Sequence, residues 1–394
     1  MKVLHICITD SGGAGSCAYR IHKSMIANGI DSKMLVLNKT RTDASIVAPY
    51  KVRGFFYRAF HKLLRLCSLY VFEYDKLIKQ SAQNSSLYTS PAGYIDISNN
   101  PLLKWADIIH VHWVDMFIDQ PTLFNKVKKP IVWTLHDEGL FHGTSHYHDS
   151  VLNNDPLELK YRKVKFRMVQ NANNLGVVLL SKYFMDSFGD LPILKNVKLT
   201  VINNSVDYNI FKPVDKIFAR NNNNIPADAV VLVFIATSIT NHYKGLNILI
   251  DSIKQLKSEK MIILAIGEDK DFIATPLVIN KGKVNDPHKL SELISAADYF
   301  VMPSLQEAFS QAPLEAMACG KPAIVFPFSG TEELITETNG IRCNGFTAKD
   351  LASAINEAMH RKYDEKQIRE FVINKFSPET ITRQYVEFYR ELLS

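Results

Sequence analysis

Two carboxylates, Glu307 and Glu315, stand eight residues apart in a segment that turns from polar to apolar. Pro313 suits the first turn of a helix, and Gly320 suits its end. Glu315 is then expected on the helix and Glu307 in the loop before it. A loop carboxylate can accept hydrogen bonds from sugar hydroxyls, and the amides at a helix start can hold phosphate. Both acids could instead be solvated surface charges, but a carboxylate in the apolar surroundings of Glu315 needs a partner.

A glycine-rich turn lies between the first apolar run and a helix expected to start near Cys17. Glycines at such a turn let backbone amides approach an anionic ligand. The spacing Gly13-x-Gly15-x-x-Ala18 satisfies a dinucleotide-binding pattern, but residues 36–39 lack the acid that would bind the ribose of NAD. Three interpretations stay open: a loop for another phosphorylated ligand or its sugar, an NAD site, and a turn without a ligand.

Six of the twelve histidines fall between positions 110 and 148. His110 and His112 would point to one face of a strand, where they could bind a metal or simply pack, and packing is the favoured interpretation. His136 directly follows the apolar run 131–135, so it is expected at the carboxyl end of a strand. A group there can meet a ligand, although a loop histidine without a ligand is the alternative.

Cationic residues mark two further places. Lys244 follows the apolar run 230–236 and a short polar loop, where its ammonium could meet phosphate. From Tyr50 to Phe72, basic residues at helical spacing oppose an apolar, aromatic stripe, and no acid is present. Such a helix can lie on anionic lipid, or it can pack on its own domain with a solvated basic face. Nucleic acid is a weaker interpretation because no nucleic-acid motif accompanies the basic residues.

The elements that must position these residues are short apolar runs that alternate with helical patterns. Continuous apolar runs predict strands buried on both faces, and the alternation predicts βαβ units with parallel sheets. The expected strands are 3–8, 32–37, 108–112, 131–135, 176–180, 199–202, 230–236, 262–266, 299–302 and 323–326. A polar break at 207–228 separates an α/β domain over 1–207 from a second over 208–377. A helix over 378–394 could pack back on the first domain.

Composition excludes several classes of protein. The chain has 394 residues, 46% of them hydrophobic and 22% charged, which is typical of globular proteins. Five cysteines without C-x-x-C spacing argue against a disulfide scaffold or a thiolate zinc site. No apolar run approaches the ~20 residues that span a bilayer, and the N-terminus does not resemble a signal peptide. We therefore expect a cytoplasmic protein. The net charge of +6 is uneven, with the excess of basic residues in the first half.

The chain resembles glycosyltransferase family 4, the group 1 glycosyltransferases, and in particular its polysaccharide-assembly branch. The resemblance covers nearly the whole length, and the spacing of Glu307 and Glu315 is its most specific part. Relatives often carry Gly-Arg before the Lys-Gly pair, where this chain has Ala236-Thr237-Ser238, which leaves Lys244 as the cation. The other matching segments are 201–207, 133–137 with 143–147, 316–322 and 329–335.

This resemblance implies the GT-B fold, two facing Rossmann-like domains with an interdomain cleft. It also implies a nucleotide-sugar donor, UDP- or GDP-linked, as substrate. Glu307 would hold hydroxyls of the donor sugar and Glu315 the ribose of the nucleotide. Lys244 would bind the diphosphate, helped by the amides that follow Phe309, beginning with Ser310.

In the first domain, the resemblance implies that Gly12 and Gly13 line the donor phosphates and the transferred sugar. His136 would contact that sugar near the reacting carbon. The family transfers with retention and without a bound metal or other cofactor. The acceptor would be a growing glycan, lipid-linked at the cytoplasmic membrane face, with the segment from Tyr50 to Phe72 touching the membrane. An NAD(P)-dependent oxidoreductase and a non-catalytic membrane scaffold are the alternatives.

Overall fold

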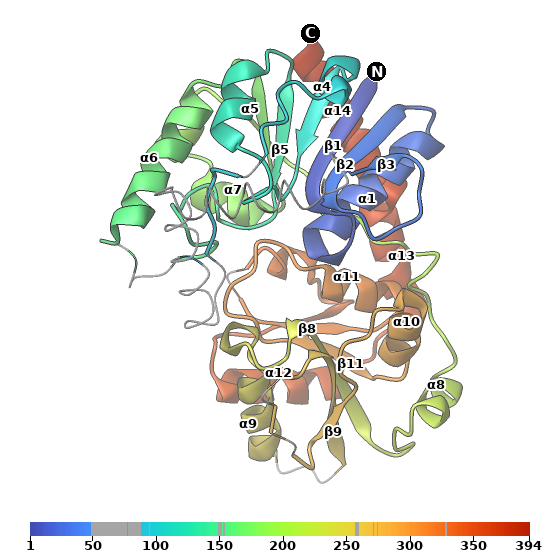
Figure 1. Cartoon of the computed structure of the whole chain (residues 1–394). Helices are drawn as coiled ribbons and strands as arrows, with labels where there is room; N and C mark the ends of the chain where they lie inside the picture. Colours follow the sequence, from blue (N-terminus) through green and yellow to red (C-terminus); the bar gives the residue numbers. More distant parts are fainter. Residues whose placement is uncertain are drawn as a thin grey trace, which may run out of the picture. The chain divides into compact units, whose positions relative to one another are not determined.

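The chain forms two compact α/β units in the computed structural model (Figure 1). The structure describes residues 1–48, 77, 88–93, 95–148, 152, 154–256, 260–270, 272–273, 275–327 and 329–394. The basic segment from Tyr50 to Phe72 lies outside these described residues. The first unit comprises Met1–Leu180, Met185–Ile202 and Thr382–Ser394, and the second comprises Ser181–Phe184 and Asn203–Ile381. The main division thus falls after Ile202, five residues before the boundary expected at 207.

The first unit is built on a seven-stranded sheet in the order β3-β2-β1-β4-β5-β6-β7. Neighbouring strands all pair in parallel. The strands are β1 (Lys2–Thr9), β2 (Asp31–Asn38), β3 (Ile46–Val47), β4 (Ile108–Val111), β5 (Ile131–Leu135), β6 (Leu175–Leu179) and β7 (Lys198–Val201). Among the described residues up to Ile202, the helices are α1 (Gly12–Ala27), α4 (Pro101–Trp105), α5 (Gln120–Lys126), α6 (Pro156–Gln170), α7 (Lys182–Phe188) and η2 (Pro192–Leu194). The first three residues of α7 belong to the second unit. Every residue of β4, β5 and β6 is buried, as continuous apolar runs predict.

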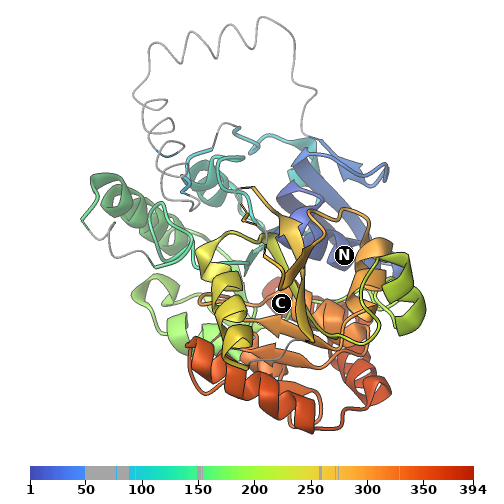
Figure 2. The ribbon, with the colours of Figure 1, turned by 90° about the horizontal axis from the view of Figure 1, so that it is seen from below.

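The second unit has a six-stranded parallel sheet in the order β10-β9-β8-β11-β12-β13. Its strands are β8 (Val230–Ser238), β9 (Met261–Glu268), β10 (Val278–Asn280), β11 (Tyr299–Met302), β12 (Ala323–Val325) and β13 (Gly340–Arg342). Its helices are α8 (Lys216–Asn222), η3 (His242–Lys244), α9 (Leu246–Leu256), α10 (Pro287–Ser295), α11 (Gln311–Ala318), η4 (Glu332–Leu334), α12 (Ala348–His360) and α13 (Glu365–Phe376). Leu249 of α9 and Ile355 of α12 are fully buried in one cluster with Leu232 of β8. These two helices therefore cover one face of the sheet (Figures 1 and 2).

The last helix, α14 (Pro378–Leu393), supplies core residues to the first unit. The hydroxyl of Tyr385 lies 3.0 Å from Oγ1 of Thr134 on β5, and Tyr389 lies 2.6 Å from Nδ1 of His110 on β4. Both tyrosines are fully buried. Gly176 of β6 allows the close approach, since a Cβ there would lie 2.7 Å from side-chain atoms of α14.

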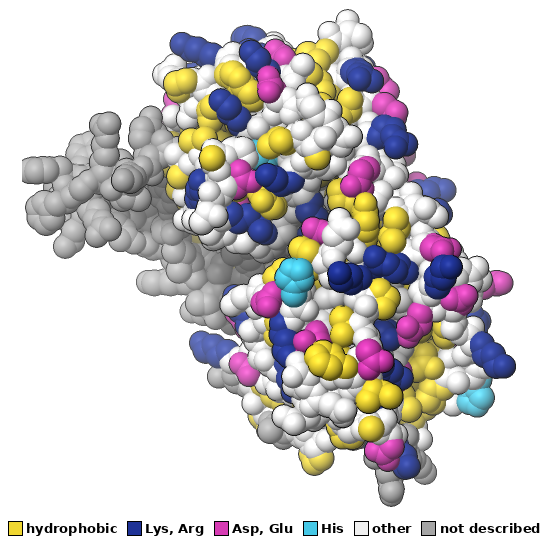
Figure 3. All heavy atoms as spheres, turned by 90° about the vertical axis from the view of Figure 1, so that its right-hand side faces the viewer, with side chains coloured by type: hydrophobic (Ala, Val, Ile, Leu, Met, Phe, Trp, Pro, Cys, Tyr) yellow, Lys and Arg dark blue, Asp and Glu magenta, His cyan; other side chains and the backbone are white. Residues whose placement is uncertain are grey.

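The fold class and the absence of a membrane-spanning segment were both expected from the sequence. The α/β class with two Rossmann-like units and parallel sheets is confirmed. Among the described residues, no helix combines the length and the apolar character needed to cross a bilayer. On the face drawn in Figure 3, basic and acidic side chains are interspersed.

Candidate functional site

The two units each carry candidate site residues at the carboxyl ends of their strands. In the first unit, His136 and Asp137 directly follow β5, where the sequence places them. They border a cavity of about 20 Å³, measured as the space open to the centre of a water molecule. Trp113 and Lys165 are also in its wall. A cavity of this size has room for a water molecule.

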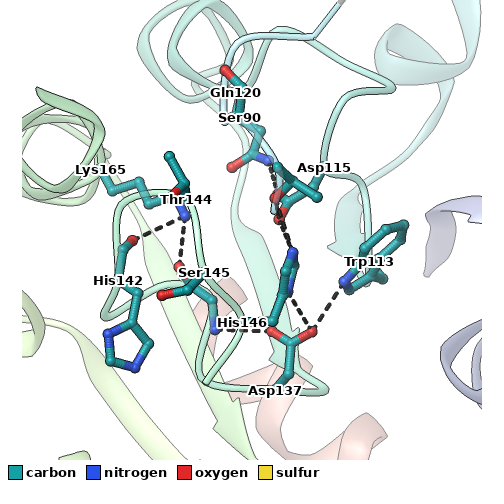
Figure 4. Close-up of polar contacts among 12 residues, drawn as sticks. Ser90, Trp113, Asp115, Gln120, Asp137, His142, Thr144, Ser145, His146 and Lys165 are labelled. Atoms are coloured by element: carbon teal, nitrogen blue, oxygen red, sulfur yellow. Dashed lines mark hydrogen bonds and ion pairs between the residues drawn. The ribbon is translucent and has the colours of Figure 1, made fainter. Parts of the chain in front are cut away.

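Asp137 is held from three sides (Figure 4). Its Oδ2 accepts from Nε1 of Trp113 at 3.1 Å and from Nδ1 of His146 at 2.7 Å, and its Oδ1 accepts from the amide of Gly139 at 2.9 Å. Burial tends to raise the pKa of this carboxyl, but His146 and the donated hydrogen bonds outweigh it and the pKa lies below its ordinary value. Asp137 is therefore an ionised anchor for the loop that follows β5.

His146 is the cation of this network. Its Nδ1 faces the carboxylate of Asp137, and its Nε2 lies 2.9 Å from Oγ1 of Thr89. That hydroxyl donates its own proton to Asp115 at 2.8 Å, so it can only accept from His146. Both ring nitrogens therefore donate, which requires an imidazolium. Burial tends to lower the pKa of His146, but the carboxylates of Asp137 and Asp115 outweigh this effect and raise the pKa above its ordinary value. Asp115 also accepts from Gln120.

Helix α6 holds the same loop through two buried charges. The Glu158 carboxylate accepts from the amide of Gly143 at 2.5 Å and from the amide and hydroxyl of Thr144 at 2.7 and 2.9 Å. Burial tends to raise the pKa of Glu158, but these donors lower it to about 2. Lys165, 1% exposed, donates to the carbonyl oxygens of Gly139 and His142 at 2.6 and 3.0 Å. No motif or spacing in the sequence points to Glu158, Lys165 or Asp115.

His136, in contrast to His146, is neutral. Burial lowers its pKa to about 4, and its Nε2 lies 3.2 Å from Nδ1 of His112. His110 is a packed strand residue, because its two ring nitrogens lie 2.7 Å from the hydroxyl of Thr134 and 2.6 Å from that of Tyr389. His5, His110 and His112 do bring ring nitrogens within 4.8 Å of one another. The hydroxyl partners of His110 favour packing over metal ligation.

The glycine-rich turn forms the first turn of α1, which begins at Gly12 and not near Cys17 as expected. Ser11 precedes the helix in an extended conformation, and Gly12 has a φ of +72°. A Cβ on Gly15 would lie 2.5 Å from the carbonyl oxygen of Thr9, so this glycine lets the helix approach the strand. A Cβ on Gly12 or Gly13 would meet nothing within 4 Å. The open space lies at the two positions that the sequence assigns to ligand binding.

In the second unit, Lys244 and Glu307 form an ion pair of 2.6 Å. Lys244 ends η3 after β8, and Glu307 lies in the loop after the neighbouring strand β11, as expected. Their side chains are 27% and 10% exposed, respectively. Gly245, with a φ of +80°, allows the two loops to meet, since a Cβ there would lie 2.2 Å from the carbonyl oxygen of Pro303. The structure thus brings together a carboxylate and an ammonium that the sequence separates by 63 positions.

The remaining candidates surround the start of α11. Glu315 is on the helix, as expected, and is half-buried. The Phe309 side chain is 5% exposed and packs in the core, while the amide of Ser310 donates to Oγ1 of Thr331 at 3.3 Å. Gly330 presses against the same loop, because a Cβ there would lie 1.6 Å from the carbonyl oxygen of Ala308.

Comparisons with known proteins show a family similarity in the second unit. Residues 229–361 match the family model described as glycosyl transferases group 1. A D-inositol 3-phosphate glycosyltransferase of Streptosporangium roseum is 24% identical over 198 residues, which are 45% of this chain and 44% of the relative. An N,N'-diacetylbacillosaminyl-diphospho-undecaprenol alpha-1,3-N-acetylgalactosaminyltransferase of Campylobacter jejuni is 29% identical over 44% of this chain and 47% of the relative. The chain thus spans less than half the length of these curated relatives.

Solved structures match the whole chain. Sucrose-phosphate synthase from Thermosynechococcus elongatus is 18% identical, with a TM-score of 0.68 and coverage of 100% of this chain and 99% of that one. HepE of Anabaena in complex with UDP-glucose is 17% identical, with a TM-score of 0.63 and coverage of 99% and 100%. The fold is therefore the GT-B fold of two Rossmann-like units. Residues 229–361 match the model of the group 1 glycosyl transferases, which is the family that the sequence resembles.

Proposed function

We propose that this chain is a glycosyltransferase that moves a sugar from a nucleotide-diphosphate donor to a growing glycan. The observation that carries the proposal is the ion pair of Lys244 and Glu307. It lies after two neighbouring strands, inside the region that matches the group 1 glycosyl transferases. Open parallel sheets bind ligands at the carboxyl ends of their strands.

The proposed roles are those that the family resemblance implies, and charge and position support them. Lys244 stabilises the donor diphosphate, and Glu307 accepts hydrogen bonds from sugar hydroxyls. Their mutual ion pair keeps both charges compensated at a site where Glu307 is only 10% exposed. Glu315 binds the ribose, and the Ser310 amide after Phe309 assists at the phosphates by exchanging its 3.3 Å contact with Thr331 for the ligand.

In the first unit, the amides of Gly12 and Gly13 bind the donor. Open space beside these two glycines, where an added Cβ would meet nothing within 4 Å, supports this role. His136 contacts the transferred sugar as a neutral imidazole. The transfer retains the anomeric configuration and uses no bound metal or other cofactor. Lys244 and the backbone amides stabilise the negative charge that develops on the leaving diphosphate.

The donor is a UDP- or GDP-sugar and the acceptor a lipid-linked oligosaccharide of cell-surface polysaccharide assembly. HepE of Anabaena was solved with UDP-glucose, which supports the donor class. The name of the Campylobacter jejuni relative contains a diphospho-undecaprenol acceptor, which supports a lipid-linked one. Contact with anionic lipid at the cytoplasmic membrane face depends on the segment from Tyr50 to Phe72 and rests on the sequence alone.

Thermal unfolding with a panel of UDP-, GDP- and ADP-sugars tests the proposal. A donor at ~100 times its dissociation constant stabilises the folded protein by about 2.7 kcal/mol. Glu307→Gln should abolish the stabilisation and the transfer of labelled sugar to a lipid-linked acceptor. Glu337→Gln, an exposed acid of the same unit, is the matched control and should change neither. The anomeric configuration of the product, read by NMR, tests retention.

The two alternatives have their own outcomes. Stabilisation by NAD or NADP in place of any nucleotide sugar would favour an oxidoreductase. Normal glycan assembly by a Glu307→Ala, Glu315→Ala double variant would favour a non-catalytic scaffold.

A further inference from the structure

Three histidine rings form a row across neighbouring strands of the first unit. His5 is on β1, His112 directly follows β4, and His136 directly follows β5, and these three strands are adjacent in the sheet. Nδ1 of His5 lies 3.1 Å from Nε2 of His112, and Nδ1 of His112 lies 3.2 Å from Nε2 of His136. Each ring nitrogen of His112 therefore faces a ring nitrogen of another histidine.

Every ring of this histidine row is neutral, because burial holds its pKa below the ordinary value. A neutral imidazole carries one N–H donor and one lone pair, and each nitrogen–nitrogen contact needs one of each. If His112 donates to His136, it must accept from His5; if it accepts from His136, it must donate to His5. All three protons therefore point along the row in one direction or the other.

The inner end of the row distinguishes these two arrangements. Nε2 of His5 is buried and has no hydrogen-bond partner among the described residues. The neighbouring ring of His22 uses its nitrogens on Ser32 and Ser45 at 2.7 and 2.8 Å, and the nitrogens of His110 face two hydroxyls. If the protons pointed inward, Nε2 of His5 would be a buried N–H without an acceptor. A buried donor without an acceptor is rarer than an unfilled lone pair, so the outward arrangement is favoured.

The outer end of the row reaches the candidate site. Nε2 of His136 faces His112, and among the described residues no protein group bonds to its Nδ1. His136 and His112 both border the cavity after β5. With the protons pointing outward, Nε2 of His136 accepts and its Nδ1 carries the proton.

We propose that His5 and His112 are positioning residues that fix the proton of His136 on Nδ1, so that His136 offers a neutral N–H donor to an oxygen of the bound ligand. The identity of that ligand as a sugar or its phosphate rests on the proposed function. The tautomer itself does not, because it is a property of the free protein. A neutral donor at this position can bond an oxygen lone pair without burying a cation.

NMR of the full chain with ¹⁵N-labelled histidine tests this inference, with the His136 signals assigned by their loss in His136→Asn. Two-bond ¹H–¹⁵N correlations report which ring nitrogen carries the proton. We expect His136 in the Nδ1–H form by a factor of about ten, from the cost of an unsatisfied buried donor at His5. His5→Phe should abolish this preference. His22→Phe, the same replacement at a buried histidine outside the row, should leave it unchanged.

A wild-type His136 in the Nε2–H form overturns the inference, and this holds even if His5→Phe does not fold. Equal His136 signals in the wild type and in a folded His5→Phe variant overturn it as well. Because these spectra need no donor, they are independent of the nucleotide-sugar panel. An Nδ1–H signal without stabilisation by any nucleotide sugar would support the row and contradict the proposed function.

Discussion

Replacement of Glu158 by glutamine tests whether α6 holds the loop that carries His136 and Asp137. The Glu158 side chain is 1% exposed and accepts from three backbone amides and one hydroxyl. Glutamine keeps one acceptor oxygen but turns an NH₂ group toward the remaining donors. One buried amide is then left without an acceptor, and the surviving bonds lose their charge. We expect a loss of about 3 kcal/mol in the free energy of unfolding.

The assay can be confined to the first unit. The three tryptophans, Trp105, Trp113 and Trp133, all belong to it, so tryptophan fluorescence follows its unfolding. For a unit of about 200 residues, 1 kcal/mol shifts Tm by roughly 2–4 °C, so Glu158→Gln should lower Tm by about 6–12 °C at pH 7. Arg162→Gln is the control, because that partner of Glu158 is 45% exposed and contributes under about 1 kcal/mol.

The pH dependence gives a second test with a fixed sign. The pKa of Glu158 is lowered to about 2, so its stabilisation is present above the ordinary carboxyl range and is lost as pH falls toward 2. The difference in Tm between the wild type and Glu158→Gln should therefore shrink in acid. A difference that grows as pH falls, or a Tm change under about 2 °C at pH 7, would refute the reasoning.

Further predictions concern the same unit. His146→Gln should cost about 3 kcal/mol, since it removes the cation between two buried carboxylates. The raised pKa of His146 means that this advantage of the wild type is complete in mild acid and declines as pH rises through that pKa, which fluorescence-detected unfolding from pH 5 to 9 will show. Gly143→Ala should cost about 2 kcal/mol, because its Cβ would lie 1.9 Å from the carbonyl oxygen of Glu158. Gly13→Ala meets nothing within 4 Å and should leave Tm within about 1 °C, yet weaken nucleotide-sugar binding measured by calorimetry.

Most of the strands that the sequence predicted contain a continuous run of buried residues. All ten expected strands are present. Nine of them contain a run of at least three buried residues, and a strand buried on both faces must be a continuous apolar run, whereas the edge strand β7 is only partly buried. Among the described residues, the strands that the sequence did not predict are β3, β10 and β13, which have two or three residues and lie at sheet edges. An edge strand of this length buries too little surface to leave a pattern in the sequence.

The candidate site was predictable where a residue adjoins a strand end. His136, Lys244 and Glu307 each follow an apolar run, so their placement at carboxyl ends needed only the strand assignment. Glu158 and Lys165 were not predictable, because most of their partners are backbone groups of a loop 13 to 26 positions away. Backbone amides and carbonyls are the same in every residue, so the sequence carries no sign of which ones a buried charge will meet.

The charge of each histidine is likewise set by its partners and not by its position in the sequence. His146 and His136 are ten positions apart in one loop, yet opposite environments determine their charge. Carboxylates on two sides raise the pKa of His146 against the effect of burial, whereas burial among other imidazoles lowers that of His136 to about 4. This difference in charge between His146 and His136 has a consequence for the proposed activity. The charged ring neutralises Asp137 and stabilises the loop, which leaves the neutral ring of His136 to face a ligand without adding a buried cation.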